Sequence, residues 1–199
     1  MSISTAAAVR AKLAKLPARS FVQATTLPGP TEAVEAELGR LTKQGELRRV
    51  RKGLYWKGPK TRFGIAAPDP AEVALEVAGR GAGPAGIAAA SWLGLTTQIA
   101  GRPIIAVPGR TPMGVPGTQF CSRPPIRREL GLRPLEVAVL EVLRDWPMSV
   151  EVGWDDVVIR IHRLAESGEI RPTVIAKDVV EERRPGLRDR WAAAFAMEA

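Results

Sequence analysis

A run of basic residues between positions 48 and 62 has the composition of a site that binds a polyanion. It contains seven Lys or Arg side chains, with one acid, Glu46, beside it, and the basic members are Arg48, Arg49, Arg51, Lys52, Lys57, Lys60 and Arg62. Guanidinium and ammonium groups donate charge-assisted hydrogen bonds to phosphate oxygens. These residues therefore favour nucleic acid as the partner, and the alternative is a solvated surface that binds nothing.

The pattern around these residues predicts a β-hairpin. Apolar residues recur in two short segments, at Leu47 and Val50 and then at Leu54 and Trp56, and a turn containing Gly53 joins the segments. Such a pattern is typical of two antiparallel strands. A hairpin would hold the basic side chains outside the core, where they can contact phosphates.

A helix is expected immediately before this hairpin, from position 31 to about 44. Val34, Leu38 and Leu41 have the i, i+4, i+7 spacing of one apolar helix face, Pro30 suits a helix start, and Gly45 suits the C-terminal cap. In a DNA-binding protein this helix would enter the major groove. Its candidate base-facing residues are Thr31, Glu32, Glu35, Gly39 and Lys43.

Three acids complicate base recognition by this helix. Glu32, Glu35 and Glu37 all lie on it. A carboxylate can accept a hydrogen bond from cytosine N4, but phosphates repel it. We therefore expect at least some of these acids to point sideways or to cap the helix start, and the hairpin to supply most of the affinity.

The segments before this helix complete a recognisable order. Val9, Leu13 and Leu16 predict a first helix over 6–16, residues 20–23 form an extended run, and an abbreviated second helix is expected at 23–27. Two helices, a longer third helix and a basic hairpin have the order of a winged helix-turn-helix. We predict such a DNA-binding domain over residues 1–64.

Charge is distributed unevenly along the chain. The net charge is +8 over 199 residues, yet residues 1–64 hold thirteen basic and four acidic side chains, whereas residues 65–199 hold sixteen and seventeen. A focused positive field attracts nucleic acid first and an anionic membrane surface second. No apolar run approaches the roughly 20 residues that span a bilayer, so no membrane partner is expected.

The remaining 135 residues, 65–199, predict an α+β domain with a small sheet and a helical C-terminal end. Pro68 and Pro70 make a stiff connector before it. The start of the chain lacks a signal-peptide pattern and Cys121 is the lone cysteine, so a cytoplasmic protein is expected. The expected helices are 69–78, 86–93, 134–145, 154–166, 172–182 and 185–196, and the expected extended runs are 102–107 and 119–122.

Catalytic motifs are absent from the sequence, and we predict no catalytic residue, cofactor site or metal site. A G-x-G-x-x-G pattern at 81–86 follows a predicted helix rather than a strand, so we interpret it as a turn between two helices. Lys177 ends a Val-Ile-Ala-Lys segment, but kinase catalytic-loop and metal-binding motifs do not occur. His162 and Cys121 lack further Cys or His ligands for zinc, and Ser91 lacks a nucleophile elbow.

Two blocks of the sequence carry a family resemblance: LGRLTKQGELRRVRKGLY at 38–55 and GPAGIAAASWLGLTTQ at 83–98. Together they resemble the AbiEi-type antitoxin family of bacterial type IV toxin–antitoxin and phage-defence operons. The order of predicted elements after Pro103 is also similar. The short 23–29 region and the acidic helix depart from the family pattern.

The resemblance implies an antitoxin that binds the double-stranded DNA of its own operator and represses its operon. Its residues 65–199 would counteract a cognate nucleotidyltransferase toxin, without needing a stable complex. Alternatives are an atypical kinase that phosphorylates the toxin, and direct binding of the toxin. By motif match, the positions implied to contact DNA or support the wing are Arg40, Arg48, Arg49, Arg51 and Tyr55.

Overall fold

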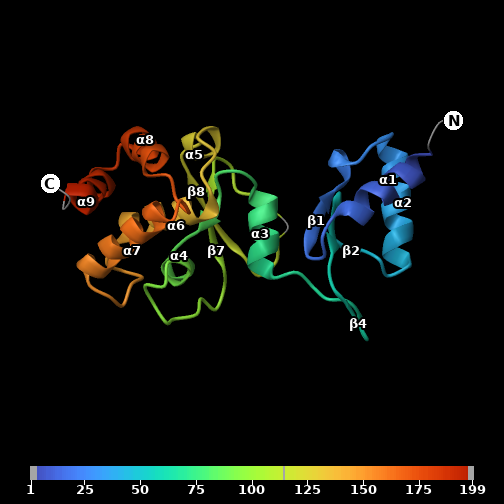
Figure 1. Cartoon of the computed structure of the whole chain (residues 1–199), viewed down its shortest axis with the longest axis horizontal. Coiled ribbons are helices and arrows are strands. Elements are labelled where there is room, and N and C mark those ends of the chain that lie inside the picture. Colours follow the sequence, from blue (N-terminus) through green and yellow to red (C-terminus); the bar gives the residue numbers. More distant parts are fainter. Residues whose placement is uncertain (1–3, 114, 197–199) are drawn as a thin grey trace. The chain divides into compact units, whose positions relative to one another are not determined.

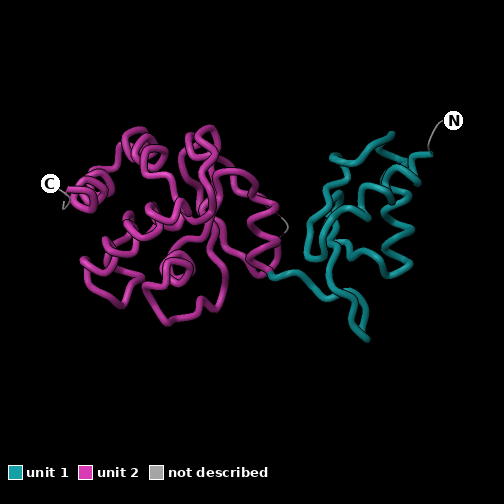
Figure 2. The backbone as a smooth tube through the Cα atoms, viewed as in Figure 1, with its two compact units in different colours: residues 1–69 teal, residues 70–199 magenta. Residues whose placement is uncertain are grey.

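The computed structural model describes residues 4–113 and 115–196, and the chain divides into two compact units, Met1–Asp69 and Pro70–Ala199 (Figure 2). The sequence placed the boundary five residues earlier, at 64/65. Residues 64 and 65 belong to the first unit because they pair with residues 60 and 61 in a short antiparallel hairpin. Each unit has its own hydrophobic core.

The described residues form a mixed α/β structure with nine α-helices, one short 3₁₀ helix and three small sheets (Figure 1). Among these helices, none combines the length and apolar character needed to cross a membrane.

The first unit contains two α-helices, a 3₁₀ turn and two hairpins. In chain order its elements are α1 (Thr5–Lys15), β1 (Ser20–Gln23), η1 (Ala24–Thr26), α2 (Thr31–Lys43), β2 (Arg48–Arg51), β3 (Leu54–Lys57), β4 (Lys60–Thr61) and β5 (Gly64–Ile65). The predicted helices at 6–16 and 31–44 are confirmed to within one residue at each end, and a hairpin, β2–β3, occurs where the sequence predicted one. The expected second helix is only the three-residue turn η1, because Pro28, Gly29 and Pro30 follow it at once.

Local signals explain α1 and α2. The hydroxyl of Ser4 accepts a hydrogen bond from the amide of Ala7 at 3.3 Å and caps the start of α1. The apolar face predicted for α2 is buried. Gly45 has a φ of +69° and donates its N–H to the carbonyl of Thr42, which ends the helix.

A three-stranded antiparallel sheet in the order β1-β3-β2 packs against these helices. Along the central strand β3, Tyr55 and its cross-strand neighbour Val22 join the core made with α1 and α2. Trp56 lies on the opposite face, where its ring packs 4.7 Å from that of Phe21. In this order β2 lies at an edge of the sheet, and it carries Arg48, Arg49 and Arg51.

The second unit surrounds a small mixed sheet, in which β6 pairs antiparallel and β8 pairs parallel with the central β7. Its core is centred on α6, which packs against α4, β6, α8 and α9. The elements are α3 (Pro70–Ala78), β6 (Gly83–Pro84), α4 (Ile87–Trp92), β7 (Ile104–Pro108), β8 (Gln119–Arg123), α5 (Ile126–Glu129), α6 (Pro134–Asp145), α7 (Trp154–Glu166), α8 (Pro172–Glu182) and α9 (Pro185–Ala196).

The glycine-rich segment 81–86 is not the simple turn that the sequence predicted, because Gly83 and Pro84 form the edge strand β6. Its glycines permit close packing: a Cβ at Gly81 would lie 2.6 Å from the backbone of Arg127, and one at Gly83 would lie 2.5 Å from the Cβ of Val137. The segment is therefore built against α5 and α6, not around a phosphate.

Candidate nucleic-acid interface

The arginines of β2 lie on both faces of an exposed strand edge. Cross-strand partners share a face of the sheet, and Arg48 pairs with Trp56 and Arg51 with Leu54, on the face away from the helices. Arg49 pairs with Tyr55 and lies on the other face. All three arginines are exposed. A phosphate backbone that followed the β2 edge would therefore meet guanidinium groups from both faces.

Other predicted DNA-binding residues hold the hairpin in place. Tyr55 is 4% exposed, so it supports the hairpin rather than contacting DNA. The Nζ of Lys57 donates hydrogen bonds to the carbonyls of Leu13 at 2.8 Å and Leu16 at 2.6 Å. These carbonyls lie at the C-terminal end of α1, where a cation is favourable. The assignment of Lys57 to DNA contact is therefore corrected: its ammonium group fastens β3 to α1.

Glu37 forms ion pairs with two arginines of the first unit, Arg10 and Arg40. The carboxylate of Glu37 is almost fully buried and accepts hydrogen bonds from the guanidinium groups of Arg10, at 2.6 Å, and of Arg40. The prediction that one of the helix acids points sideways is met by Glu37. The Arg10–Glu37 pair joins α1 to α2, whereas Arg40 lies one turn from Glu37 on α2 itself. The Arg40 side chain is 56% exposed, so DNA contact by Arg40 stays a prediction.

The outward surface of α2 is nearly neutral. Thr31 is its first residue and Lys43 its last, and both are exposed. Glu32 and Glu35 are exposed between them. Helix α2 has 13 residues with a rise of 1.5 Å each, so Thr31 and Lys43 lie on the order of 18 Å apart along the helix axis. The positive field of this unit therefore comes from the hairpins and from α1, which carries Arg10, Lys12 and Lys15 and no acid, and not from α2.

The structure places Lys60 and Arg62 on a second hairpin, β4–β5, which the sequence analysis missed. Both side chains are exposed. The second hairpin is joined to the sheet by two hydrogen bonds, from Arg48 Nη1 to the carbonyl of Ile65 at 3.4 Å and from Trp56 Nε1 to the carbonyl of Ala66 at 3.0 Å. The signal that could have revealed it is the glycine of the Thr-Arg-Phe-Gly segment at 61–64.

Four basic side chains on the two hairpins have no acidic partner among the residues that the structure describes. Within the described part of the chain, no carboxylate lies within ion-pairing distance of Arg49, Lys52, Lys60 or Arg62. The guanidinium of Arg48 contacts a carbonyl oxygen. Lys52 is exposed at the tight turn of the β2–β3 hairpin, next to Gly53 with φ +76°. These groups are therefore available to phosphate oxygens.

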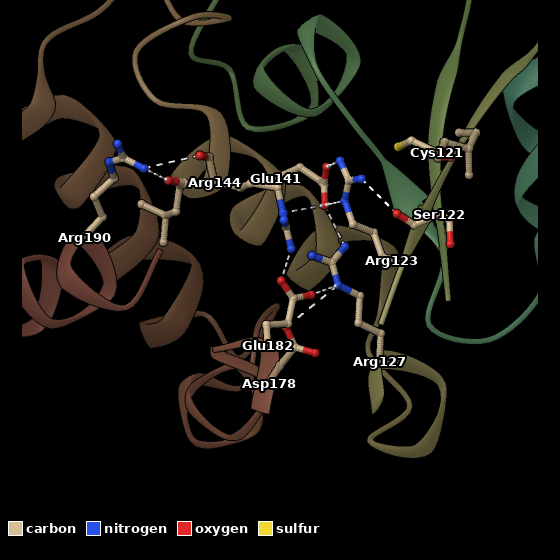
Figure 3. A network of polar contacts seen from close by, with 11 residues as sticks. Cys121, Ser122, Arg123, Arg127, Glu141, Arg144, Asp178, Glu182 and Arg190 are labelled. Carbon is tan, nitrogen blue, oxygen red and sulfur yellow. Dashed lines mark hydrogen bonds and ion pairs between the residues drawn. The ribbon is translucent and has the colours of Figure 1, made fainter. Parts of the chain in front are cut away.

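In the second unit, by contrast, one set of arginines forms a network with carboxylates, in which Arg127 is buried and Arg123 and Arg144 are partly buried (Figure 3). Arg127, on α5, is completely buried and contacts Glu141 and Glu182, each at 2.7 Å. Glu141 also accepts from Arg123 at 2.6 Å, and Arg144 pairs with Glu182. The network ties α5, α6, α8 and the end of β8 together.

Asp178 is the poorly satisfied member of this network. In the described residues neither of its carboxylate oxygens accepts a hydrogen bond, and its nearest cation, Arg127 Nε, is 3.8 Å away. Burial raises the pKa of Asp178 to about 6, although the charge of Arg127 opposes the shift. Burial would also raise the pKa of Glu141, but the hydrogen bond from Arg123 and the charge of Arg127 lower it overall.

The sequence analysis also missed this network, although Glu136 and Glu141 on the apolar face of α6 were a signal for buried ion pairs. Glu136 accepts hydrogen bonds from Arg171, which lowers its pKa against the effect of burial. Arg127 is inaccessible to solvent. The network therefore stabilises the unit and does not present a reactive group to a substrate.

The structure also shows the surroundings of the residues that the sequence analysis considered for catalysis or metal binding. His162 Nε2 lies 2.8 Å from the carbonyl of Ala194, and the ring contacts Phe195. Cys121 is half-buried on β8, and burial raises the pKa of its thiol. Lys177 is exposed on the helix α8, whereas a kinase lysine lies on a strand. No cluster suited to a metal ion occurs among the described residues.

No protein-family model matches this chain, and no curated protein sequence matches it either. Among solved structures, the chain is similar to the RV2827C protein from Mycobacterium tuberculosis, with 20% sequence identity, a TM-score of 0.46, and coverage of 98% of this chain and 78% of that one. The function proposed for this chain therefore depends on its own residues.

Proposed function

We propose that this chain is a DNA-binding antitoxin whose first unit represses its own operon. The observation that carries the proposal is the set of exposed arginines and lysines on the two hairpins, of which Arg49, Lys52, Lys60 and Arg62 have no carboxylate partner among the described residues. Residues 1–69 hold thirteen basic and five acidic side chains, whereas residues 70–199 hold sixteen of each. A field confined to one unit suits a phosphate backbone better than it suits general solubility.

The order of elements supports a winged helix-turn-helix for this unit. Helix α1, the turn η1 and helix α2 precede the β2–β3 hairpin, which corresponds to the wing. In that arrangement α2 would enter the major groove, with Thr31 and Lys43 on its exposed surface. Affinity would come chiefly from the exposed side chains of the two hairpins, namely Arg48, Arg49, Arg51, Lys52, Lys60 and Arg62.

The antitoxin part of the proposal rests on the resemblance of residues 38–55 and 83–98 to AbiEi-type antitoxins. The second unit would counteract a nucleotidyltransferase toxin encoded beside this chain. Most of the second block lies in β6, α4 and the loop after it. Glu151 holds that loop through hydrogen bonds to the amide of Thr97 at 2.7 Å and to the side chain of Gln98.

DNA binding is tested with the full chain and a duplex taken from immediately upstream of its own gene. Replacing Arg48, Arg49 and Arg51 with alanine should weaken binding more than tenfold and should lower the slope of log affinity against log salt by about 2–3, at roughly 0.9 per phosphate contact. The matched control replaces three exposed arginines of the second unit, Arg102, Arg110 and Arg128.

The control variant loses the same charge, so its binding should stay close to that of the parent chain. Equal losses in the two variants would mean that binding responds to net charge alone, and the hairpin assignment would be wrong. An unchanged salt slope in the β2 variant would contradict the assignment equally.

Antitoxin activity is tested by co-expressing the full chain with the nucleotidyltransferase encoded by the neighbouring gene and measuring growth. Rescue of growth should persist in the β2 triple variant, because repression and neutralisation are assigned to different units. Mass spectrometry of the toxin after incubation with the chain, ATP and Mg²⁺ separates phosphorylation from the other routes. Co-purification of the two proteins would identify direct binding.

A further inference from the structure

Phe63 stands at the tip of the β4–β5 hairpin with 85% of its surface exposed. No other large apolar side chain in the described part of residues 1–69 is exposed. Single exposed apolar residues are common on proteins and need no explanation by themselves. The structure around Phe63 decides whether this one is a ligand-binding group.

The tip that carries Phe63 is held in one conformation. The hydroxyl of Thr61 accepts the N–H of Phe63 at 3.2 Å and donates to the carbonyl of Gly64 at 2.9 Å. Gly64 has a φ of +101°, which closes the turn and which other residues rarely adopt. Thr61 and Gly64 are also cross-strand partners. A preformed tip loses little conformational entropy when it binds.

The base of the same hairpin is attached to the sheet. The amide of Ala66 donates to the carbonyl of Pro59 at 3.0 Å, and the carbonyl of Ala66 accepts from the Trp56 indole. Gly58 makes this contact possible, because a Cβ there would lie 2.2 Å from Trp56 Nε1. The hairpin therefore extends from a fixed base, as the β4 segment in Figure 1 shows.

Positive charge surrounds the exposed ring. The guanidinium carbon of Arg62 lies 4.6 Å from the centroid of the Phe63 ring, and Lys60 is exposed on the adjoining strand. Residues 58–68 contain no acid. An aromatic ring flanked by cations and presented on a narrow, rigid tip suits a polyanion that also offers an apolar surface, and stacked bases provide one.

We propose that the β4–β5 hairpin enters the minor groove of the DNA bound by the first unit, with Phe63 as an apolar wedge against a base step and Arg62 beside it in the groove. This inference rests on the proposed DNA binding. Minor-groove proteins insert side chains such as Phe between base steps and bend the duplex, and arginine favours narrow minor grooves. The undeformed groove is about 6 Å wide, which excludes a helix, and an apolar wedge enters it by partly unstacking a base step.

Duplex DNA fits these residues better than a single strand does. Proteins that bind single strands stack successive bases on several aromatic side chains along a groove. Here one exposed ring occupies one tip, which matches a wedge at one base step. The two hairpins then have separate tasks: β2–β3 supplies phosphate contacts, and β4–β5 deforms the duplex.

The experiment uses the full chain and the same upstream duplex, with Phe63→Ala, Phe63→Leu and Arg62→Ala. Phe63→Ala should weaken binding by about tenfold, the loss of about 1.4 kcal/mol expected for one stacked aromatic, at an unchanged salt slope. Phe63→Leu should retain most of the affinity, because leucine also serves as a wedge. Arg62→Ala should weaken binding and lower the salt slope by about 1.

Bending is measured from the gel mobility of circularly permuted fragments of that duplex. The parent chain and Phe63→Leu should bend the DNA, and Phe63→Ala should bend it less. The control is Met148→Ala, which removes an apolar side chain of similar exposure, 83%, from the second unit and should change neither affinity nor bend. Thermal unfolding should be the same for all variants because Phe63, Arg62 and Met148 are all exposed.

The outcomes separate this inference from the function on which it rests. If Phe63→Ala binds and bends DNA like the parent chain while the β2 triple variant loses binding, the wedge is overturned and DNA binding stands. A larger loss on a single-stranded oligonucleotide of the same sequence than on the duplex would also overturn the minor-groove assignment. If the parent chain does not bind the duplex, both proposals fail together.

Discussion

Two sets of arginines, one in each unit, play opposite parts in this protein. In the first unit the arginines of β2 and of the β4–β5 hairpin are exposed, while in the second Arg127 is fully buried between two glutamates. The difference shows that the number of basic residues does not identify a nucleic-acid surface. Their burial and their partners decide whether they hold a fold together or remain available to a ligand.

The two sets of arginines differ because the two units have hydrophobic cores of different size. A buried guanidinium must be paired and hydrogen-bonded, because an unpaired buried charge is strongly destabilising. The second unit has a layer of helices around α6 thick enough to enclose such pairs. In the first unit β2 is a sheet edge, where side chains reach solvent at once. Glu37, which is buried and joins Arg10 to Arg40, is the exception there.

Removing one buried partner should have the largest effect. Arg127→Met should lower the free energy of unfolding of the second unit by about 3–5 kcal/mol, because Glu141 and Glu182 lose hydrogen bonds inside the core. Urea unfolding followed by fluorescence reports this unit, since four of the five tryptophans lie in it. The neighbouring exposed Arg128→Met should change the value by less than about 0.5 kcal/mol. Similar losses of unfolding free energy in Arg127→Met and Arg128→Met would contradict the contrast between buried and exposed arginines.

Asp178 should make the second unit less stable as pH rises. The unfolded carboxyl releases its proton near its ordinary pKa of 3.8, whereas the folded one keeps it to about 6. Between these values the folded state binds more protons, so stability falls with increasing pH, by at most about 3 kcal/mol. Asp178→Asn should match the parent chain at pH 4 and exceed its stability at pH 7.

Urea unfolding of the parent chain and of Asp178→Asn between pH 4 and pH 7 measures the difference between their free energies of unfolding. Groups that titrate equally in the two chains cancel in that difference. Glu136 and Glu141 have lowered pKa values, so their contribution to stability is present above their ordinary pKa of 4.5 and is lost as pH falls below it, in both chains alike. A stability difference that did not change between pH 4 and pH 7 would contradict the environment assigned to Asp178.

Gly58→Ala should affect the first unit at the base of its second hairpin. The new methyl group would lie 2.2 Å from Trp56 Nε1 and 2.8 Å from the carbonyl of Ala66, so the hydrogen bond between them must shift. Overpacking of this kind costs about 1–3 kcal/mol. Thermal unfolding and near-ultraviolet circular dichroism of Trp56 would measure it. A control is Gly39→Ala on α2, where a methyl group meets nothing within 4 Å.

The smallest effect on stability should come from the exposed β2 edge. Arg49→Ala should change the free energy of unfolding by less than about 0.5 kcal/mol, since the side chain is exposed and has no carboxylate partner within the described residues. It should still reduce the salt slope of DNA binding by about 0.9. A large loss of stability together with unchanged DNA binding would reverse the roles assigned to the two sets of arginines.

Elements with strong local signals were predictable. The spacing of Val34, Leu38 and Leu41 and the glycine at 45 located α2, and prolines located the starts of α6, α8 and α9. Strand β6, helix α5 and the β4–β5 hairpin were missed. They are two to four residues long, so their conformation depends on partners distant in the sequence, such as the pairing of Gly83 with Ala106.

The candidate site was predictable only in part, for the same reason. Residue type and spacing placed positive charge on a hairpin. The contacts of Lys57 with α1 and of Tyr55 with the core join residues that the local pattern does not relate. Their reassignment from DNA contact to support therefore needed the tertiary structure.

The sequence by itself determined where the charge lies along the chain, which segments are amphipathic, and where glycine or proline ends an element, because these depend on residues within about one turn of each other. Only the tertiary structure decided which arginines are buried beside carboxylates and which remain exposed. It also decided that Phe63 stands exposed on a rigid tip beside Arg62. Burial and ion pairing depend on groups brought together from distant parts of the chain.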